Sequence, residues 1–169
     1  AGGCCSTVSV LTQSTGITDV VAIKTETTST FALKADGTLW VTGTDSIGEL
    51  GLGGSSSQGV YTQTLNNVRK IAVTQRLAYA IKVDGTLWVA GWNNVGQKGI
   101  GEAYNYSNDK SSPFQQVSIT NVKDIVVNQY SATVLKADGT IWSTGTNSNG
   151  YLGLGSESVI LSFTQVPIP

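Results

Sequence analysis

Histidine and methionine are absent from this 169-residue sequence, and charged residues make up only 12% of it. Without histidine the chain lacks the commonest general base and the commonest metal ligand in proteins. Ten basic and eleven acidic residues leave a formal net charge of −1, which gives no electrostatic attraction to nucleic acid or to anionic membranes. The composition therefore argues against metal and cofactor sites and against nucleic-acid binding.

Long apolar runs and a cysteine framework are missing too. No apolar run approaches the roughly 20 residues of a membrane span, and no basic segment followed by an apolar core indicates a secretory signal. The sequence predicts neither membrane insertion nor a disulfide scaffold. The only cysteines are the neighbours Cys4 and Cys5, and a bond between neighbours is strained, so we expect free thiols or an inter-chain bridge.

The N-terminal end of the sequence allows two explanations. A chain that begins at Ala1 and contains no Met is what removal of an initiator Met before a small residue leaves, and synthesis would then be cytoplasmic. A trimmed or processed longer chain explains the same beginning. Residues 1–7 are small and glycine-rich, which predicts a flexible arm.

A threefold internal repeat dominates the remaining sequence. Three segments align from Val20, Val68 and Val122, and each carries an L/I-K-x-D-G-T-L/I-W motif followed by glycines at fixed offsets. The repeat is marked by three tryptophans and by the glycines of three Asp-Gly pairs. These anchors are Trp40, Trp88 and Trp142, with Gly37, Gly85 and Gly139.

Each repeat has the pattern of short β-strands. In the first repeat we expect strands near 20–23, 30–34 and 38–42, with Asp36-Gly37 forming a type I′ hairpin turn. A fourth, outer strand is predicted where an apolar or aromatic residue precedes Gln by two positions. This pattern occurs four times, at Leu11 to Gln13, Tyr61 to Gln63, Phe114 to Gln116 and Phe163 to Gln165. No segment has helical periodicity, so the sequence predicts an all-β fold.

The combination of LKxDGTLW, NxxGxLGxG and FxQV resembles the repeat of the regulator of chromosome condensation family over nearly the whole chain. The resemblance implies four-stranded β-propeller blades, usually seven in a ring. It divides the chain into a single domain over 8–169, with repeats at about 8–58, 59–111 and 112–169. The chain departs from the family in having three repeats and in lacking the histidine that often follows the first strand.

Three blades alone leave apolar flanks uncovered, because propeller blades stack face to face. Four arrangements remain open: head-to-tail association of copies into a ring, exchange of a terminal outer strand, an arc resting on another protein, and a fragment of a larger ring. The candidate exchange strands contain Leu11 and Gln13 at one end and Phe163, Gln165 and Val166 at the other.

One loop region departs from the repeat and is the candidate binding site. Trp92 stands where the other repeats have Thr44 and Thr146, so it is either an exposed anchor or a plug between blades. The insertion after Gly101 contributes aromatic and amide side chains suited to glycans or protein surfaces, although a tolerated loop extension explains it equally. The candidate residues are Trp92, Asn93, Asn94, Tyr104, Asn105 and Tyr106.

Other recurring residues are interpreted as structural. The three repeat tryptophans are expected to pack between blades rather than bind ligands. Lys34, Lys82 and Lys136 precede the hairpin turns and form either a basic row on one rim or solvated strand ends. The acidic residues are scattered or lie in turns, and neither cysteine has a histidine to activate it, so the sequence predicts no enzyme activity.

These observations lead to a non-enzymatic binding and assembly module. The composition, poor in charge and rich in Ser, Thr and Asn, favours a structural component of a bacteriophage-like virion, either a capsid decoration protein or a tail or host-attachment protein at the particle surface. The alternative is a secreted or cell-surface adhesin or lectin that binds glycan or protein. A chromatin or GTPase regulator is the least favoured hypothesis, because the chain is acidic, poor in Arg and short of blades.

Overall fold

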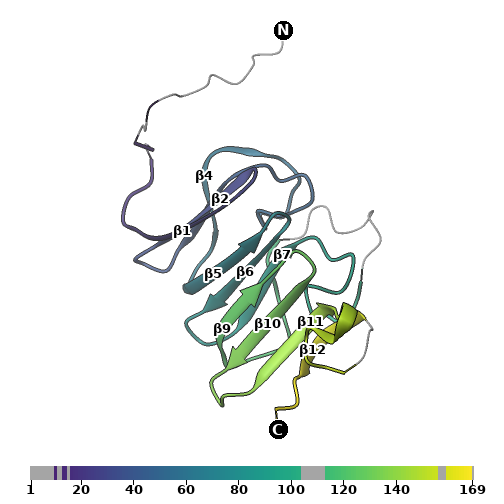
Figure 1. Cartoon of the computed structure of the whole chain (residues 1–169). Coiled ribbons are helices and arrows are strands. Elements are labelled where there is room, and N and C mark those ends of the chain that lie inside the picture. The colour runs from purple at the N-terminus through teal and green to yellow at the C-terminus, as the bar shows by residue number, and fades with distance from the viewer. Residues whose placement is uncertain (1–9, 11–12, 15, 104–112, 156–158, 169) are drawn as a thin grey trace.

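The computed structural model describes residues 10, 13–14, 16–103, 113–155 and 159–168, which form three four-stranded antiparallel sheets (Figure 1). Blade 1 comprises β1 (Val20–Glu26), β2 (Ser29–Lys34), β3 (Leu39–Gly43) and β4 (Gln58–Leu65). Blade 2 comprises β5 (Val68–Thr74), β6 (Leu77–Lys82), β7 (Leu87–Gly91) and β8 (Gln115–Gln116). Blade 3 comprises β9 (Val122–Val127), β10 (Ser131–Lys136), β11 (Ile141–Thr146) and β12 (Val159–Gln165).

The predicted all-β fold of three four-stranded blades is confirmed. Within the described residues the only helix is the short 3-10 helix η1 (Ser148–Gly150). Strand order in every blade follows the chain, so each sheet is a simple antiparallel meander. Successive side chains of each central strand therefore point to opposite faces of the sheet. Each face can contact one neighbouring blade.

The sheet boundaries differ from the predicted repeat boundaries by one strand. Each outer strand closes the sheet that precedes it, because β4, β8 and β12 pair with β3, β7 and β11. The blades therefore span 20–65, 68–116 and 122–165. A further outer strand was expected at Leu11 to Gln13. Gln13 lies exposed outside any strand, and Leu11 lies outside the described residues. The arm 1–7 with both cysteines also lies outside the described residues.

The hairpins between the second and third strands are not the predicted type I′ turns. In blade 1 the Lys34 amide donates to the Thr38 carbonyl and the Gly37 amide donates to the Lys34 carbonyl, both at 3.0 Å. Only the glycine has a positive φ, at 80°, so the loop is a three-residue type I turn that ends in a left-handed glycine. Asp36 stabilises the turn with its side chain, and its backbone is not in the left-handed conformation.

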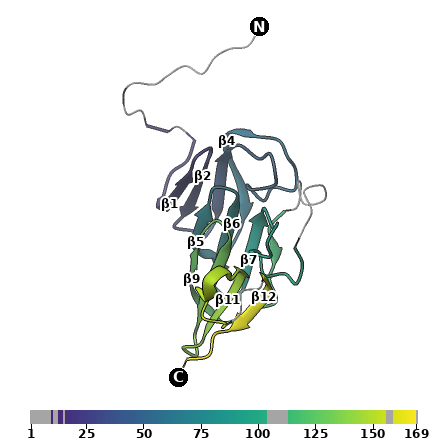
Figure 2. The same cartoon turned by 45° about the vertical axis from the view of Figure 1, so that its right-hand side comes forward.

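The three sheets are stacked face to face, like blades around an axis (Figures 1 and 2). Their first strands, β1, β5 and β9, contact one another in that order, whereas the fourth strands lie at the opposite edge of each sheet. We call the face of a blade toward the preceding blade its leading face, and the opposite face its trailing face.

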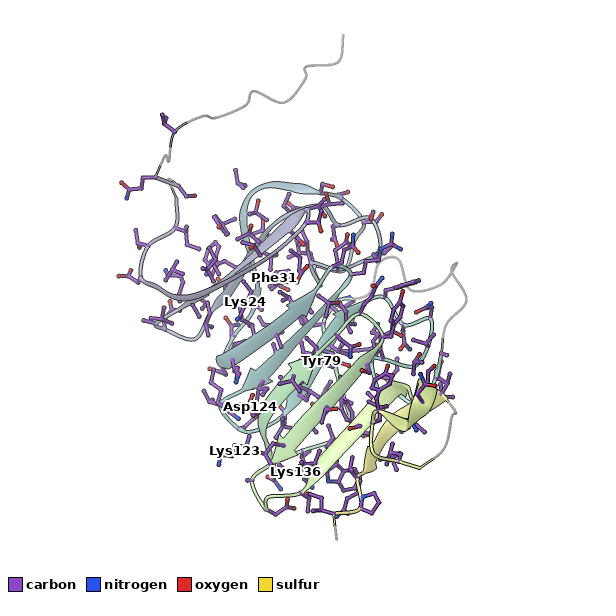
Figure 3. The ribbon with its side chains drawn as sticks, viewed as in Figure 1. Lys24, Phe31, Tyr79, Lys123, Asp124 and Lys136 are labelled. Atoms are coloured by element: carbon purple, nitrogen blue, oxygen red, sulfur yellow. The ribbon has the colours of Figure 1, made fainter. Side chains whose placement is uncertain are left out.

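Two hydrophobic cores lie between the blades. In the first, Phe31 and Leu33 on the trailing face of blade 1 pack against Ala80 on the leading face of blade 2. In the second, Tyr79 on the trailing face of blade 2 packs against Val134 of blade 3. Figure 3 shows Phe31 and Tyr79 in these two successive positions. Blade 2 is thus covered on both faces, while the described blades cover only one face each of blades 1 and 3.

Candidate functional site

A local network holds each hairpin and its tryptophan. In blade 2 the Trp88 Nε1 donates to Thr86 Oγ1 at 3.0 Å, and that hydroxyl donates to Asp84 Oδ1 at 2.7 Å. The Lys82 ammonium lies 4.0 Å from the centre of the Trp88 ring, a cation–π contact. Blades 1 and 3 repeat the arrangement, with the lysine 5.8 and 5.2 Å from the ring.

The recurring tryptophans and lysines are therefore partners within one blade. Trp88 also packs against the core between blades 1 and 2, and Trp142 against the core between blades 2 and 3. Lys34 and Lys136 lie within 4 Å of the turn carboxylates Asp36 and Asp138. Since each lysine covers a ring and approaches or pairs with an acid, the row of lysines does not form a simple basic rim.

The hairpin hydrogen bonds lower the pKa of the turn carboxylates. At Asp84 the hydroxyl of Thr86 and the Thr86 amide both donate to Oδ1, which stabilises the charged form. Lys82 adds a smaller electrostatic contribution. The pKa values of Asp36 and Asp138 are lowered for the same reasons.

We expect a Thr86→Val substitution to raise the pKa of Asp84 toward 3.8, the ordinary value of an aspartate side chain. Valine keeps the branched shape but removes the hydroxyl that contributes most to the lowered pKa. Carboxyl-carbon NMR titration measures all three turn acids in one sample, and Asp36 and Asp138 serve as internal controls. An unchanged Asp84 titration, or an equal rise at all three acids, would contradict the hydrogen-bond explanation.

Neighbouring blades are joined near the first strands by main-chain and charged contacts. The Val68 amide donates to the Gly37 carbonyl at 2.9 Å, and the equivalent Val122 amide donates to the Gly85 carbonyl at 3.0 Å. Between blades 2 and 3, the Lys70 ammonium also pairs with Asp124 at 2.5 Å. The guanidinium of Arg69 donates to two main-chain carbonyls at the start of β9, those of Val122 and Lys123, at 2.6 and 2.9 Å.

Near the outer strands, an aromatic ring of each following blade covers a glycine of the preceding loop. Phe114 of blade 2 lies against Gly51, and Phe163 of blade 3 lies against Gly99, so closely that a Cβ on either glycine would overlap the ring. Isolated β-bridges reinforce these contacts, namely Leu52 with Pro113 and Ile100 with Ser162. Phe163 is therefore part of an inter-blade contact, and its strand β12, which contains Gln165, is paired in its own blade.

The leading face of blade 1 exposes residues that are buried at the equivalent positions of blades 2 and 3. Ile23 is 57% exposed, whereas Ile71 and Ile125 are each 4% exposed. Val20 is 39% exposed, whereas the equivalent valines 68 and 122 are 3% and 2% exposed. These side chains occupy the same repeat positions. The difference in their exposed fractions therefore shows how much of each side chain a preceding blade would cover.

The trailing face of blade 3 is the second open flank. Val126 is exposed there, and Leu135 and Ile141 are only partly buried, whereas Leu33 and Leu39 at the equivalent positions of blade 1 are buried. These side chains line a hollow of about 280 Å³. Thr133 and Ser143 replace the Tyr79 and Val89 of blade 2 at this face, and their hydroxyls share a hydrogen bond of 2.9 Å.

The described residues of the predicted binding loop make contacts within the chain. Trp92 is half-buried, and the guanidinium of Arg76 lies 5.1 Å from the centre of its ring. Asn93 is fully buried: its Oδ1 accepts from the Lys98 amide at 3.0 Å, and its Nδ2 donates to the Glu102 carbonyl at 2.7 Å. Asn93 therefore shapes the loop and is unavailable to a ligand, which corrects its assignment as a binding residue.

The remaining candidates of that loop have different positions. Asn94 is half-buried, and its Oδ1 accepts from Gln97 Nε2 at 3.0 Å. Tyr104, Asn105 and Tyr106 lie outside the described residues. The sequence analysis missed Arg76, although the signal was available: an arginine stands where the other repeats have Thr28 and Tyr130.

Blade 1 contains a buried acid where the other repeats have asparagine. Asp45, Asn93 and Asn147 occupy one repeat position, and the Oδ1 of each accepts a backbone amide five residues later at 2.9 to 3.0 Å. Asp45 is fully buried, and its Oδ2 has no hydrogen-bond partner among the described residues. Burial raises the pKa of the Asp45 carboxyl, and the neighbouring Glu49 carboxylate raises it further.

Two kinds of feature are absent from the part of the chain that the structure describes. The described residues contain no group of three or more Asp, Glu, Cys or His side chains that could hold a metal ion. None of their helices is long and apolar enough to cross a membrane. The two open blade flanks are the apolar surfaces of the described structure that are buried at the equivalent positions of other blades.

Comparison with solved structures identifies the fold as an RCC1-type β-propeller repeat. The chain superposes on Prp20p from Saccharomyces cerevisiae with a TM-score of 0.75 and 19% identity, over 90% of this chain and 39% of that one. It also superposes on yeast RCC1 (Prp20) bound to Kap60, at 0.75 and 20% identity over 90% and 38%, and on human WBSCR16, at 0.69 and 20% over 89% and 40%.

These likenesses establish the fold of the blades and confirm the resemblance seen in the repeat. The chain spans about two fifths of the length of the propeller chain in each of these three structures. No protein-family profile matches the sequence, and no curated protein sequence matches it. Prp20p binds Gsp1p, histones and Kap60, which are properties of that protein.

Proposed function

We propose that this chain is a non-enzymatic binding and assembly module whose two open blade flanks are covered by protein. The observation that supports it most directly is the exposure of Ile23 at a repeat position where both other isoleucines are buried. Monomeric proteins rarely leave contiguous apolar surface open, and such surface commonly marks protein contacts. Protein binding is also a property of the similar propeller Prp20p, which binds Gsp1p, histones and Kap60.

Site-specific photocrosslinking tests this proposal. A benzophenone side chain at position 23 should crosslink to protein under native conditions, because the flank of blade 1 is covered in the working state. The same group at Val83, an exposed residue of the middle blade, is the matched control. Absence of any protein crosslink at position 23, or equal crosslinking at both positions, would count against the proposal.

At a finer level, we place this module on the surface of a bacteriophage-like virion, as a decoration or tail-associated host-attachment protein made in the cytoplasm. The support is compositional: only 12% of the residues are charged, and the chain is rich in Ser, Thr and Asn, as surface β-proteins of particles often are. Sedimentation of intact particles tests it. The chain should co-sediment in fixed stoichiometry, and a chain found only in the unsedimented fraction would contradict a particle role.

A regulator that binds a small GTPase or chromatin is the second candidate function. It is favoured by the fold shared with Prp20p, described as binding Gsp1p and histones. Pull-down with purified small GTPases and with nucleosomes tests it directly. Retention on either one, with loss of retention after an Ile23→Asp substitution, would favour this role over the particle role.

The glycan-binding alternative, in which the chain is secreted or displayed at a cell surface, has less support from the described residues. Of its described candidate residues, Asn93 is buried, and Trp92 and Asn94 are half-buried and already contacted by neighbouring side chains. A glycan array with the Trp92→Ala variant as control separates this alternative from the assembly role, because assembly through the flanks does not require Trp92.

A further inference from the structure

We propose that Arg76 and Trp92 form a docking site for a protein segment that carries an exposed carboxylate beside an apolar side chain. The two residues belong to the middle blade, and both faces of that blade are covered by described blades. The site therefore does not depend on what covers the open flanks of blades 1 and 3. It is a second surface, separate from those flanks, and goes beyond the assembly function.

The fold places the two side chains next to each other. Arg76 lies in the turn between β5 and β6, and Trp92 directly follows β7. The Trp92 amide donates to the Arg76 carbonyl at 2.8 Å, and the adjacent residues Leu77 and Gly91 are partners in the pairing of β6 with β7. The guanidinium lies 5.1 Å from the centre of the Trp92 ring, in the range of a cation–π contact. The backbone therefore holds the pair together before any partner binds.

The pair is not required for the fold of a blade. Blade 1 has Thr28 and Thr44 at these two positions, and the Thr44 amide donates to the Thr28 carbonyl at 2.9 Å. Blade 3 has Tyr130 and Thr146 there, joined by the same bond at 2.9 Å. Both blades thus form the same backbone contact without an arginine stacked on a tryptophan. The Arg76–Trp92 pair is an addition of blade 2 to a shared framework, as a binding feature would be.

The guanidinium of Arg76 has donors available to a partner. Within the part of the chain that the structure describes, it makes no ion pair and no side-chain hydrogen bond. The one enclosed side-chain polar atom that lacks a hydrogen-bond partner among those residues is Oδ2 of Asp45. The nitrogens of Arg76 are therefore open to solvent, although the residue as a whole is half-buried.

The lysines that cover the repeat tryptophans show how such a cation is balanced elsewhere in the chain. The Lys34 Nζ lies 3.9 Å from Oδ2 of Asp36, the acid of its own turn. The Lys136 Nζ lies 3.8 Å from Oδ2 of Asp138 in the same way. Arg76 also covers a tryptophan, but no described acid balances it. A carboxylate of a partner would supply that acid, and the planar guanidinium can donate two parallel hydrogen bonds to it.

Aromatic side chains of the next blade lie at the same end of the sheets. Tyr130, at the repeat position of Arg76, is 45% exposed, and Tyr151, in the loop between β11 and β12, is 53% exposed. Tryptophan, tyrosine and arginine are enriched in protein interfaces and among the residues that contribute most to binding. An apolar side chain beside the partner's carboxylate would therefore have aromatic surface to contact.

The charge at this end of the blades favours a carboxylate over the phosphates of a nucleic acid. Apart from the buried Lys98, Arg76 is the only basic residue in the described turns after the first strands and the described loops after the third strands. Nucleic-acid binding draws on several phosphate contacts at once, which one guanidinium does not provide. A single guanidinium beside aromatic rings suits a single carboxylate on a peptide.

Peptide titration followed by NMR of the four tryptophan indole N–H groups tests the proposal. The probe is a short Gly/Ser peptide with Glu on both sides of a central Leu, and the same peptide with Gln in place of Glu is its control. The Trp92 signal should shift with the Glu peptide at about millimolar concentration. The other three indoles donate to threonine hydroxyls at the hairpin end of each blade, so their signals should not move. They are those of Trp40, Trp88 and Trp142.

Substitution of the arginine separates docking from a merely structural role. Arg76→Gln should weaken binding of the Glu peptide at least about tenfold, because it removes the charged donors, and should leave binding of the Gln peptide unchanged. Lys82→Gln is the matched control: Lys82 also covers a tryptophan, 4.0 Å from the centre of the Trp88 ring, but at the hairpin end of the same blade. That variant should bind the Glu peptide as the unmodified chain does. Unchanged near-ultraviolet circular dichroism checks the folding of both variants.

Three results would overturn the proposal. The first is equal affinity for the Glu and Gln peptides, or no shift of the Trp92 signal with either. The second is an Arg76→Gln variant that binds the Glu peptide as tightly as the unmodified chain. The third is a single-stranded oligonucleotide that shifts the Trp92 signal at a lower concentration than the Glu peptide, because the site would then bind phosphate in preference to carboxylate.

Discussion

A Gly91→Ala substitution is expected to destabilise the chain by about 3 kcal/mol or more. Gly91 ends β7 with φ at 102°, and a Cβ built on it would overlap the main-chain carbonyl oxygen of Arg76. That oxygen accepts a hydrogen bond of 2.8 Å from the Trp92 amide, so it cannot move without breaking the connection between the two chain segments. Relief of the clash therefore requires a shift of the turn between β5 and β6.

Gly155→Ala is the matched control for that prediction. Gly155 also has a positive φ, at 72°, but a Cβ there would meet nothing within 4 Å. Its substitution should cost only the left-handed backbone term of about 1 kcal/mol. The free energies of unfolding in urea measure both changes, and equal losses at the two positions would show that backbone conformation alone, without the Arg76 clash, determines the requirement for glycine.

An Asp45→Asn substitution should stabilise the chain by about 1 kcal/mol at pH 7. Asparagine is the residue found at this position in blades 2 and 3, where its Oδ1 accepts the same backbone amide. The substitution removes a buried carboxylate whose Oδ2 has no partner among the described residues and replaces that oxygen with a donor. In blade 2 the corresponding Asn93 nitrogen donates to the Glu102 carbonyl.

The gain from Asp45→Asn should depend on pH. Because burial raises the pKa of Asp45 in the folded chain above the ordinary aspartate value of 3.8, the folded state binds this proton more tightly than the unfolded state. The stabilising contribution of that proton is fully present below about pH 3.8 and is lost as the pH rises through the folded pKa. The variant and the unmodified chain should therefore have nearly equal free energies of unfolding at acidic pH. The advantage of the variant should grow as the pH rises to neutral.

Urea unfolding of the two proteins at a series of pH values measures this difference. The turn acids, whose pKa values are lowered, make both proteins lose stability at low pH, and that common effect cancels in the comparison. A difference that is constant with pH, or that shrinks toward neutral pH, would mean that Asp45 is not the titrating group. Glu49→Gln is a useful companion, because removing its charge should lower the pKa of Asp45.

The repeat made much of the architecture predictable. The spacing of Trp40, Trp88 and Trp142 identified three equivalent units, and the Asp-Gly pairs located the hairpin in each. Local sequence was sufficient because antiparallel meanders connect neighbouring strands through short turns, so their pairing is mostly local. The type of turn was predicted incorrectly, since Asp-Gly suits both type I′ turns and type I turns that end in a left-handed glycine.

The candidate site was less predictable for a different reason. The apolar flanks were expected, but Ile23 has the same sequence environment as Ile71 and Ile125, and only stacking reveals that it alone is exposed. Asn93 looked like a loop ligand residue, yet its amide is consumed by the loop itself. Trp92 stood out in the sequence, whereas its partner Arg76 lies 16 residues away and is brought to it by the pairing of β6 with β7.

The sequence by itself determined the number of repeats, the strands and hairpins within each blade and the all-β class, because these depend on residues close together in the chain. The tertiary structure alone decided which strand closes which blade, which isoleucine remains exposed and which glycines receive an aromatic ring from the next blade. Those features depend on contacts between equivalent positions of different repeats. Burial at such positions is set by the presence or absence of a neighbouring blade, which no local pattern records.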